Sequence, residues 1–311
     1  MNVYRNINDL PRFENAVVTV GSFDGVHLGH RKILQQLLSE AEKINGTPLV
    51  VTFYPHPKQV LQNLSSPLLT LNTASEKYNI LHSEGIENII EVPFDETFSK
   101  LTAAEYIKSF LVEKLHIHTI ITGYDHRFGN NREGDFHLLE TASLQYGFKV
   151  KEIPAHILKN LTISSTKIRA ALLKADLETA SAYLGYDYFF SGIVVEGNKL
   201  GRTIGYPTAN LKIQDEHKLI PGNGVYAVQV KINNEGNYKG MMNIGIRPTV
   251  NGSKRMIEVN LFDFDKDIYG ATLTVVLKKW LRTEQKFDGL EALKKQLALD
   301  KQHANSYFQE T

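Results

Sequence analysis

The chain has 311 residues and contains no cysteine. The lack of cysteine excludes disulfide bonds and thiolate metal sites, and it favours a cytoplasmic location. The chain also lacks a long hydrophobic run, because no apolar stretch approaches the roughly 20 residues that a membrane-spanning helix needs. Residues 1–13 are polar and hold no apolar segment of the kind found in signal peptides. We therefore expect a cytoplasmic protein that does not enter the membrane.

An excess of charge of one sign is also missing, since 35 Lys and Arg side chains stand against 34 Asp and Glu, for a formal net charge of +1. This balance gives no electrostatic reason to expect nucleic acid or an anionic membrane as a partner. A binding site for phosphate groups would therefore have to be built locally. The length suits two ordinary domains, and the oligomeric state stays open.

The first part of the chain alternates between strand-like and helix-like patterns. Short apolar runs predict strands at residues 17–20, 49–53, 88–92, 119–122 and 149–153, and amphipathic patterns predict helices at 30–44, 74–82, 103–115 and 136–146. This alternation is typical of an α/β domain, with a parallel sheet and helices on both of its faces. A further helix is expected at 166–184, and Gly185 is a plausible signal for its end.

The second part follows a different pattern after the aromatic residues 186–190. Alternating runs predict strands at 191–196, 225–232, 239–244, 256–262 and 272–277, separated by turns that carry Gly and Asn. Leu290, Leu293, Leu297 and Leu299 indicate one closing helix. The prediction is a small antiparallel β-barrel, with domains at residues 1–185 and 186–311.

The most informative run is at residues 21–30, which read G-S-F-D-G-V-H-L-G-H and lie between a predicted strand and a predicted helix. Glycines allow the backbone to approach a ligand closely, and the N-terminus of a helix offers free N–H groups and positive potential. The imidazoles of His27 and His30 can donate hydrogen bonds to phosphate oxygens, as charge builds up on them. The alternative is a surface turn with two incidental histidines.

The sequence His-x-Gly-His at this point resembles the signature of the nucleotidylyltransferase superfamily. Three further segments, at residues 52–57, 123–129 and 163–169, extend the match. In order, these segments resemble the adenylyltransferase domain of bacterial bifunctional riboflavin kinase/FAD synthetases, over residues 15–185. The resemblance implies a Rossmann-like fold in which the phosphate of FMN attacks the α-phosphate of ATP, giving FAD and pyrophosphate.

The resemblance also implies which residues form this first site. His27 and His30 would be catalytic. Contacts with ATP and its phosphates are implied for Gly21, Phe23, Asp24, Gly25, His27, His30, Ser164, Ser165, Thr166 and Arg169, and contacts with flavin for Pro55, His56, Asp125 and Arg127. His56 could equally be a turn residue between two prolines. His126 departs from the aromatic residue expected there, which weakens the assignment of that loop to flavin.

A second motif, at residues 200–210, reads L-G-R-T-I-G-Y-P-T-A-N. Thr and Asn oxygens are hard ligands that suit Mg²⁺. The composition alone favours a glycine-rich hairpin loop with Asn210 in a turn. Together with residues 221–227, 243–249, 257–260 and 281–287, however, the motif resembles riboflavin kinases, over residues 190–290.

The second resemblance implies a site that phosphorylates riboflavin. Glu258 would be the general base, and Thr208 and Asn210 would bind Mg²⁺. Contacts with ATP are implied for Gly201, Arg202, Gly205, Pro207, Thr208 and Asn210, and contacts with flavin for Arg282, Glu284 and Phe287. Alternation places Glu258 and Asn260 opposite Ile257 and Val259, but leaves open which face meets a ligand. Many relatives carry His at the position of Asn260, and Arg282 could instead form a surface salt bridge.

The two motif sets together predict a bifunctional, magnesium-dependent enzyme that makes FMN and then FAD, with ATP as a substrate of both reactions. One rival is a nucleotidylyltransferase that acts on another phosphate, such as a pantetheine phosphate. Another is a flavin-binding or regulatory protein that has lost catalysis. The barrel motifs speak against the first rival, and the intact His27, His30, Thr208, Asn210 and Glu258 speak against the second.

Overall fold

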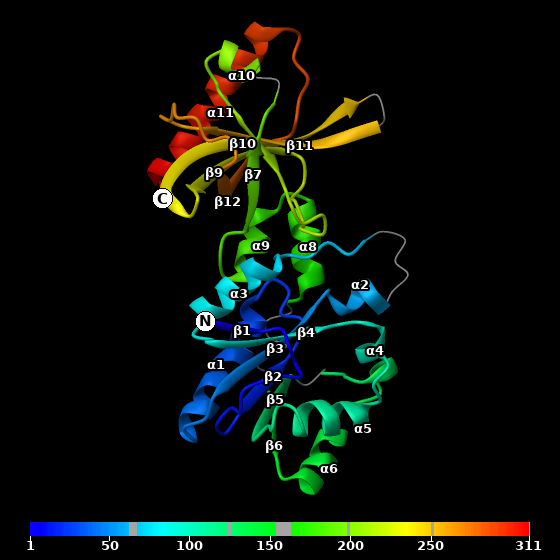
Figure 1. Ribbon diagram of the computed structural model, residues 1–311. Coiled ribbons are helices and arrows are strands. Elements are labelled where there is room, and N and C mark those ends of the chain that lie inside the picture. Colours follow the sequence, from blue (N-terminus) through cyan, green and yellow to red (C-terminus); the bar gives the residue numbers. More distant parts are fainter. Residues whose placement is uncertain (62–66, 124–125, 154–162, 198–199, 250–251, 311) are drawn as a thin grey trace. The chain divides into compact units, whose positions relative to one another are not determined.

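The structure is a computed structural model that describes residues 1–61, 67–123, 126–153, 163–197, 200–249 and 252–310 (Figure 1). Contacts within the chain divide it into two compact units, Met1–Ser165 and Thr166–Thr311. The predicted boundary near residue 185 falls later in the chain than this division. Among the described residues, no helix is both long and apolar enough to cross a membrane.

The first unit contains a six-stranded parallel sheet in the order β1-β4-β3-β2-β5-β6. Its strands are β1 (Asn2–Tyr4), β2 (Val17–Val20), β3 (Pro48–Tyr54), β4 (Asn88–Pro93), β5 (Thr119–Gly123) and β6 (Lys149–Ile153). The five predicted strands are confirmed. Strand β1 was not predicted, because three residues that are exposed or half-buried offer no apolar run.

Helices cover both faces of this sheet. They are α1 (Leu28–Lys43), α2 (Pro57–Leu61), α3 (Ala74–Ser83), α4 (Glu96–Ser99), α5 (Ala103–Glu105), the π-helix η1 (Tyr106–Val112), the 3₁₀ helix η2 (Asn130–Arg132) and α6 (Phe136–Tyr146). Val18 and Val20 of β2 share a core with residues of η1 and α6, whereas α1 contacts β2, β3 and β5. Because alternate residues of a strand point to opposite faces, the buried Val17 and Thr19 of β2 face α1. The predicted α/β class is therefore confirmed.

The strand order places three loops side by side at one edge of the sheet. Strand β2 lies between β3 and β5, and all three are parallel. The segments that follow them are residues 21–27, 55–56 and, within the described part, 126–129. Ligands of such sheets bind beyond the carboxyl ends of the strands, at the point where the strand order reverses. Three of the four sequence segments assigned to the first site, at residues 21–30, 52–57 and 123–129, therefore meet where the fold favours a ligand.

The single helix predicted at 166–184 is wrong. The structure has two helices there, α8 (Ser165–Leu173) and α9 (Leu177–Leu184). The chain turns between them at Ala175, whose φ of 60° is left-handed, and the Asp176 side chain accepts a hydrogen bond from the backbone N of Thr179 to cap α9. The predicted end is confirmed, because Gly185 caps α9 with a φ of 80°.

The second unit is a closed six-stranded barrel in the order β10-β11-β8-β7-β12-β9, in which every pair of neighbours for which a register is defined is antiparallel. Its elements are β7 (Phe189–Val195), the one-turn helix α10 (Leu200–Thr203), β8 (Ala209–Lys212), β9 (Gly224–Ile232), β10 (Glu235–Thr249), β11 (Gly252–Leu261), β12 (Thr272–Arg282) and α11 (Leu290–Glu310). The predicted barrel and its one closing helix are confirmed.

Helix α11 packs against the outer face of the barrel. It contacts β9, β10 and β12, and the buried Ala304 lies in a cluster with Ala227, Met241 and Phe262. Strand β8 was not predicted, because its first two residues, Ala209 and Asn210, fall inside the motif that composition had assigned to a loop. This strand brings Asn210 beside Glu258 of the neighbouring strand β11.

Candidate active sites

The histidine motif of the first unit surrounds the start of helix α1. His27 is the N-cap residue, and its Nδ1 atom accepts a hydrogen bond from the backbone N of His30 at 3.3 Å. Since Nδ1 is an acceptor, the proton of a neutral His27 ring is on Nε2. The two rings stack, with centroids 3.7 Å apart and planes inclined by 11°. The prediction that both histidines stand at a helix N-terminus is confirmed.

Both histidines are held in the neutral form. Burial lowers the pKa of His27 to about 4, although nearby Asp24 acts in the opposite direction. Burial also lowers the pKa of His30 well below its ordinary value, with smaller contributions from His27 and Lys77. The Nδ1 atom of His30 is buried and has no hydrogen-bond partner among the described residues. A buried polar atom without a partner is costly, so a ligand would gain by bonding to it.

The loop before these histidines is fixed by contacts from distant parts of the chain. The carboxylate of Asp24 accepts a hydrogen bond from the backbone N of Leu71 at 2.7 Å, and Gly25 has a left-handed φ of 86°. Ser165, at the start of α8, donates from its hydroxyl to the carbonyl of Asp24 at 2.9 Å. This bond brings the predicted phosphate segment to the histidine loop. Asp24 itself braces the loop with its carboxylate.

Two of the other residues predicted for this site, His56 and Arg127, have partners within the protein. The Nδ1 atom of His56 accepts a hydrogen bond from the backbone N of Lys58 at 3.1 Å, which supports its role as a turn residue at α2. Arg127 forms an ion pair with Asp135 at 3.1 Å. Gly21 and Phe23 are in the loop, with the Phe23 ring 5.1 Å from that of His30. Pro55 follows β3, Ser164 precedes α8, Thr166 and Arg169 belong to α8, and Asp125 lies outside the described residues.

Lys77, a buried lysine on α3 beside this loop, was not predicted from the sequence. Its side chain is 7% exposed, and its Nζ atom donates to the hydroxyl of Thr52 at 2.8 Å and to the carbonyl of Ser22 at 3.4 Å. The available signal was its spacing, because Lys77 and the buried Leu81 are four residues apart on one helical face. Lysines are seldom buried without a partner, so one on an apolar face marks a site of interest.

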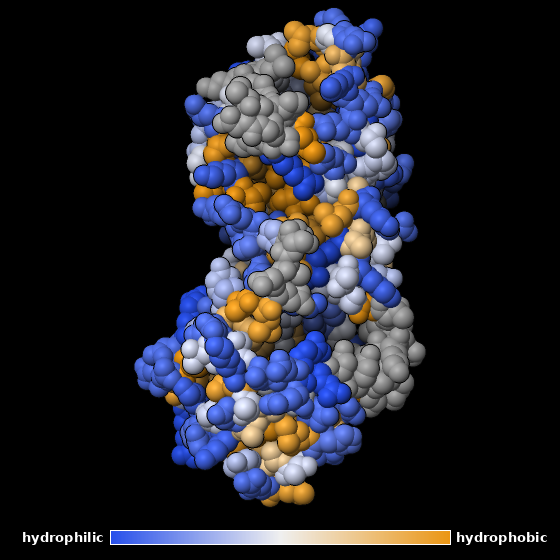
Figure 2. All heavy atoms as spheres, turned by 90° about the vertical axis from the view of Figure 1, so that its right-hand side faces the viewer, coloured by the Kyte–Doolittle hydropathy of each residue, from blue (hydrophilic) through white to orange (hydrophobic). Residues whose placement is uncertain are grey.

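The second unit has a cavity of about 410 Å³ on the outer face of the barrel, beside α11. Seven predicted residues line it: Gly201, Thr208, Asn210, Glu258, Arg282, Glu284 and Phe287. The predicted Arg202, Gly205 and Pro207 do not line it. Apolar side chains, among them Val225, Met241 and Met256, form much of the rest. In Figure 2, hydrophobic side chains also reach the surface of this unit, in the upper half of the view.

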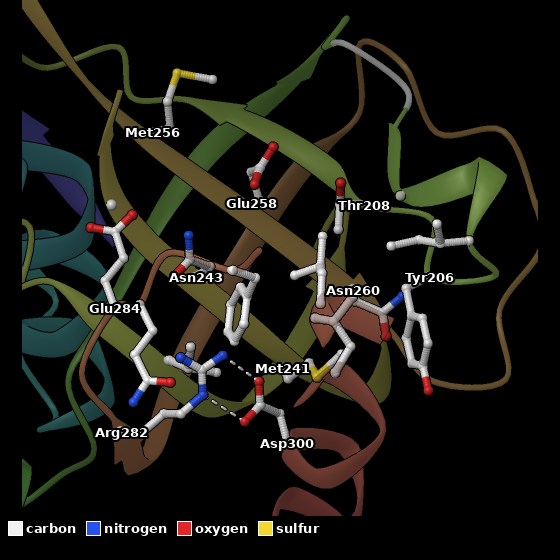
Figure 3. Close-up of a pocket in the computed structure, with 18 of the residues that line it drawn as sticks. Tyr206, Thr208, Met241, Asn243, Met256, Glu258, Asn260, Arg282, Glu284 and Asp300 are labelled. Carbon is white, nitrogen blue, oxygen red and sulfur yellow. Dashed lines mark hydrogen bonds and ion pairs between the residues drawn. The ribbon is translucent and has the colours of Figure 1, made fainter. Parts of the chain in front are cut away.

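The register of three strands places Glu258 between two amides. Glu258 of β11 lies opposite Asn210 of β8 on one side and Asn243 of β10 on the other. All three line the cavity, whereas Ile257 and Val259 are buried. Figure 3 shows the side chains of Glu258, Thr208 and Asn243 around the same space. The strand face that carries Glu258 and Asn260 is therefore the one that meets the cavity, a point that alternation in the sequence had left open. Asn243 belongs to the segment at residues 243–249, but no role was predicted for it from the sequence.

The glycine-bearing motif does not form the hairpin loop that composition favoured. Its first residues form the helical turn α10, after which Gly205 takes a left-handed φ of 84°. Asn210 lies in a strand and not in a turn. Its side chain is 7% exposed, and its Oδ1 atom has no hydrogen-bond partner in the described part of the chain. Thus each candidate site contains a buried polar atom that is left for a ligand, on His30 in one unit and on Asn210 in the other.

Arg282 forms a partly buried ion pair, and not the surface salt bridge considered from the sequence. Its Nε and Nη2 atoms donate to the two carboxylate oxygens of Asp300 at 2.8 and 2.7 Å (Figure 3). Asp300 is fully buried on α11 and also accepts from Gln296 at 2.9 Å. A bidentate pair of this kind fixes both partners. It ties the closing helix to the end of β12 in the wall of the cavity.

Glu284 lies against the backbone of β10. Its Oε2 atom accepts a hydrogen bond from the backbone N of Ile246 at 3.4 Å. A Cβ atom on Gly245 would lie 2.0 Å from the other carboxylate oxygen, so a larger residue there would displace the carboxylate of the exposed Glu284 side chain. Phe287 faces Arg282, with the guanidinium carbon 5.7 Å from the centre of the ring. Arg282, Glu284 and Phe287 together line one part of the cavity.

Two family models match the chain, one for each unit. The model described as FAD synthetase matches residues 10–167, and the model described as riboflavin kinase matches residues 184–308. The two matches do not overlap, and together they cover most of the chain.

Curated relatives match over the full length. A bifunctional riboflavin kinase/FMN adenylyltransferase from Escherichia coli strain K12 is 40% identical over 310 residues, which cover 99% of this chain and 98% of the relative. One of the same description from Buchnera aphidicola subsp. Schizaphis graminum is 41% identical over 313 residues, covering 99% of each. A solved structure described as a macrolide-efflux protein from Streptococcus pneumoniae has a TM-score of 0.87 and 32% identity, covering 98% of each chain.

Proposed function

Since the chain belongs to the family of bifunctional riboflavin kinase/FMN adenylyltransferases, we propose that it is an enzyme with both activities. The barrel unit phosphorylates riboflavin with ATP to give FMN. The α/β unit transfers the adenylyl group of ATP to FMN, giving FAD and pyrophosphate. The observation that carries this proposal is the match of both family models to one chain whose full-length relatives are named for both activities.

The adenylyl transfer proposed for the first unit is a reaction of two phosphates. A phosphate oxygen of FMN forms a bond to the α-phosphorus of ATP, and the bond from that phosphorus to pyrophosphate breaks. The FMN phosphate is already ionised near pH 7, so no general base is needed. What the protein must supply is stabilisation of the negative charge that builds up on the α-phosphate.

His27 and His30 supply that stabilisation in the proposal. Both are neutral, so each ring has one N–H to donate, and that of His27 is on Nε2. The N-terminus of α1 adds free backbone N–H groups at the same place. Fixed donors cost no reorganisation when the charge appears, which is why such groups typically contribute about 10²–10³ in rate. Their position at the edge of the sheet supports this role.

The remaining predicted ligands of the first site divide by what the contacts support. Ser165 is bonded to the Asp24 carbonyl, which supports a place for Ser164 and Ser165 near the triphosphate, and Thr166 and Arg169 stay proposed contacts. Asp24 stays a proposed ATP contact, and its carboxylate also braces the loop through the backbone N of Leu71. Pro55, His56, Asp125 and Arg127 stay proposed flavin contacts. Of these, His56 and Arg127 have protein partners that a ligand would have to share.

The proposed kinase reaction needs a base, because its nucleophile is an alcohol. The ribityl hydroxyl of riboflavin attacks the γ-phosphorus of ATP, the bond to ADP breaks, and the hydroxyl proton passes to the carboxylate of Glu258. Support comes from the place of Glu258 at the cavity, between Asn210 and Asn243. Apolar side chains on one part of the lining and amides on another suit a ligand with a flat ring system and a polar chain.

Thr208 and Asn210 are the proposed magnesium ligands of the kinase. Hydroxyl and amide oxygens suit this hard cation, and the buried, unpartnered Oδ1 of Asn210 fits such a role. When bound, Mg²⁺ would offset the negative charge of the ATP phosphates. Gly201, Arg202, Gly205 and Pro207 stay proposed ATP contacts. The proposal includes a cytoplasmic location, because both reactions consume ATP.

Separation of flavins by chromatography, after incubation with riboflavin and Mg-ATP, tests the proposal. We expect FMN to accumulate first and FAD to follow. FMN supplied with Mg-ATP should give FAD directly, and removal of Mg²⁺ with a chelator should stop both reactions. Binding of flavin without any conversion would favour a regulatory protein. Adenylylation of a pantetheine phosphate, with FMN left unchanged, would favour the other rival.

A further inference from the structure

A buried lysine of the first unit lies beneath the histidine loop, and no reaction described so far uses it. The ammonium group of Lys77 donates to the hydroxyl of Thr52 and to the carbonyl of Ser22. The Thr52 hydroxyl donates in turn to the same carbonyl at 3.2 Å. Thr52 belongs to β3 and Ser22 to the loop after the neighbouring strand β2. Lys77 therefore joins helix α3 to strand β3 and to the loop that leads to His27.

Burial of an ammonium group is costly unless something in the fold compensates for it. Asp24 of the loop and Glu91 of β4 lie close enough to favour the charged form. Glu91 is itself bound by the hydroxyl of Tyr78 and by Arg5, whose Nε lies 3.0 Å from its Oε1. The acidic groups thus offset only part of the cost. A methionine of similar length would fill the space without that cost, so the charge needs a reason of its own.

The positive charge of Lys77 also acts on the histidines. It contributes to the low pKa of His30, after burial and the nearby His27 ring. A neutral His30 can stack on a neutral His27, as observed, whereas two imidazolium rings at that separation would repel each other. The ammonium thus adds positive potential beside the loop and favours the neutral form of the His30 ring.

We propose that Lys77 is a positioning residue for adenylyl transfer, which holds the Ser22 carbonyl and thereby the histidine loop in the shape that receives the α-phosphate. It acts through Ser22, Thr52 and the two histidines and does not touch the substrate. This inference rests on the proposed function of the first unit. Lys77 lies outside every motif found in the sequence, and the loop residue to which it donates, Ser22, is 55 positions away along the chain.

The test compares three variants in the full-length protein. Lys77→Met keeps the length of the side chain and removes the charge, whereas Lys77→Arg keeps a positive charge. Lys32→Met is the matched control, because it removes an exposed positive charge from α1, close to the histidines in sequence. For each variant, kcat and KM are measured for FAD formation from FMN and ATP. Riboflavin phosphorylation and the thermal unfolding temperature are measured on the same samples.

We expect Lys77→Met to lower kcat for FAD formation by about 100-fold, with KM for ATP changed less than threefold, because the loop acts mainly on charge formed in the transition state. The rate of riboflavin phosphorylation by Lys77→Met should stay within about twofold of that of the unaltered protein, and so should both rates of the Lys32→Met control. Lys77→Arg should recover part of the lost rate. Adenylylation by Lys77→Met within threefold of the unaltered rate would overturn the inference while leaving the proposed function intact.

The pH profile gives a measurement that a purely structural role would not change. Burial lowers the pKa of Lys77 to about 8, so its charge is present below that pH and is lost above it. The kcat/KM for ATP in FAD formation, which reports groups of the free enzyme, should therefore fall above about pH 8. The groups that face Lys77 are Asp24, Glu91 and His30, and the neutral Tyr78 belongs to the same helix.

In Lys77→Arg the alkaline fall should disappear, because a guanidinium stays charged throughout this range. An alkaline fall that is the same in Lys77→Arg and in the unaltered protein would overturn the inference. This comparison also decides the case if Lys77→Met does not fold, as shown by loss of riboflavin phosphorylation together with a lower unfolding temperature. An unaltered protein that phosphorylates riboflavin but makes no FAD would overturn the proposed adenylyl transfer, and the role of Lys77 with it.

Discussion

The two candidate sites contain opposite kinds of groups. In the first unit, His27 and His30 are neutral donors at a helix N-terminus, above the buried ammonium of Lys77. In the second, Glu258 lies between the amides of Asn210 and Asn243. Both reactions transfer a group from ATP, so the ATP substrate does not explain the difference. The nucleophile does, because a phosphate oxygen is already ionised near pH 7 and an alcohol is not.

Separation of the two units should have the largest effect. A fragment of residues 186–311 should phosphorylate riboflavin at a rate close to that of the full chain and should form no FAD, because His27 and His30 are missing from it. A longer fragment, residues 166–311, keeps α8 and α9. It should have the same activities and a higher unfolding temperature, since the backbone N of Gly222 donates to the carbonyl of Leu172 at 2.9 Å.

Activity assays and circular dichroism on both fragments check this separation. Circular dichroism establishes that each fragment is folded before its rates are compared. FAD formation by either fragment, or loss of kinase activity in both folded fragments, would show that the two sites are not independent. The same experiment decides whether residue 165 or residue 185 is the better boundary of the kinase.

Loss of the carboxylate from the second site should have the next largest effect. In Glu258→Gln, riboflavin phosphorylation should fall by about 10²–10⁴, the usual range for a general base. FAD formation from supplied FMN should be nearly unchanged, as should Mg-ATP binding measured by calorimetry. The matched control is Glu291→Gln, which alters an exposed carboxylate of α11 in the same unit.

Two other results would change the interpretation of Glu258. If Mg-ATP binding disappears together with turnover, Glu258 binds metal or supports the structure. If turnover is unchanged, Glu258 is an ordinary strand carboxylate, and the contrast between a donor site and a base site does not hold.

Loss of one donor from the first site should have a somewhat smaller effect, on the other activity. His27→Ala or His30→Ala should slow adenylylation by about 10²–10³, the typical cost of losing one donor to transition-state charge, and should largely spare riboflavin phosphorylation. His137→Ala, which alters an exposed histidine of α6, is the control. Rates of both reactions for each variant check the prediction. Adenylylation within about threefold of the unaltered rate in both variants would refute the phosphate role of the histidines.

The sequence predicted those parts of the sites that depend on neighbouring residues. His27 and His30 lie within one motif at a strand–helix junction, and alternation alone placed Glu258 opposite Ile257. Lys77 and Asn243 were missed, because their roles arise from contacts with residues distant in sequence or on neighbouring strands. Asp300 was missed for the same reason, since it meets Arg282 only after α11 folds back onto the barrel.

The fold shows the same division between local and distant information. Short apolar runs predicted most strands of the first unit and alternating runs most strands of the second, but the three-residue β1 and the four-residue β8 are too short to give either signal. The helix predicted at 166–184 was too long, because two helices with similar apolar patterns follow each other with only Lys174–Asp176 between them. A capping aspartate, Asp176, was the local signal of that break.

A smaller effect is expected from the ion pair that joins α11 to the barrel. In Asp300→Asn, the guanidinium of Arg282 loses its bidentate partner, which should destabilise the second unit by about 3 kcal/mol, near the lower end for a broken buried pair. If Arg282 also contacts flavin, KM for riboflavin should rise about tenfold, equivalent to about 1.4 kcal/mol. Adenylylation should not change.

Denaturant unfolding followed by Trp280 fluorescence measures this loss of stability. The chain has one tryptophan, which lies on β12, so its fluorescence reports on the second unit. Asp288→Asn, an exposed change close to the same helix, is the control. Equal stability of the two variants would mean that the closing helix does not depend on the pair, and that Arg282 is better placed to bind a ligand than the ion pair suggests.

The smallest effect is a difference in how the two units respond to acid. Burial lowers the pKa of His27 from 6.5 to about 4, so the unfolded chain binds its proton more readily than the folded chain. The stability that follows is fully present above pH 6.5, and it is lost as the pH falls towards 4. Between pH 7.5 and 5.5 this amounts to about 1 kcal/mol in the first unit, and His30 acts in the same direction. Both histidines of the second unit, His217 and His303, are exposed.

Denaturant unfolding at the two pH values separates the units, because circular dichroism follows both and Trp280 fluorescence follows the second alone. The circular dichroism transition of the first unit should shift to lower denaturant at pH 5.5, whereas the fluorescence transition should shift less. His27→Asn sharpens the test, since asparagine can still cap α1 but does not titrate. In that variant the first unit should lose less stability on acidification than in the unaltered protein. An equal loss would mean that other groups cause the acid sensitivity, and that the neutral state of His27 contributes nothing measurable to the fold of the donor site.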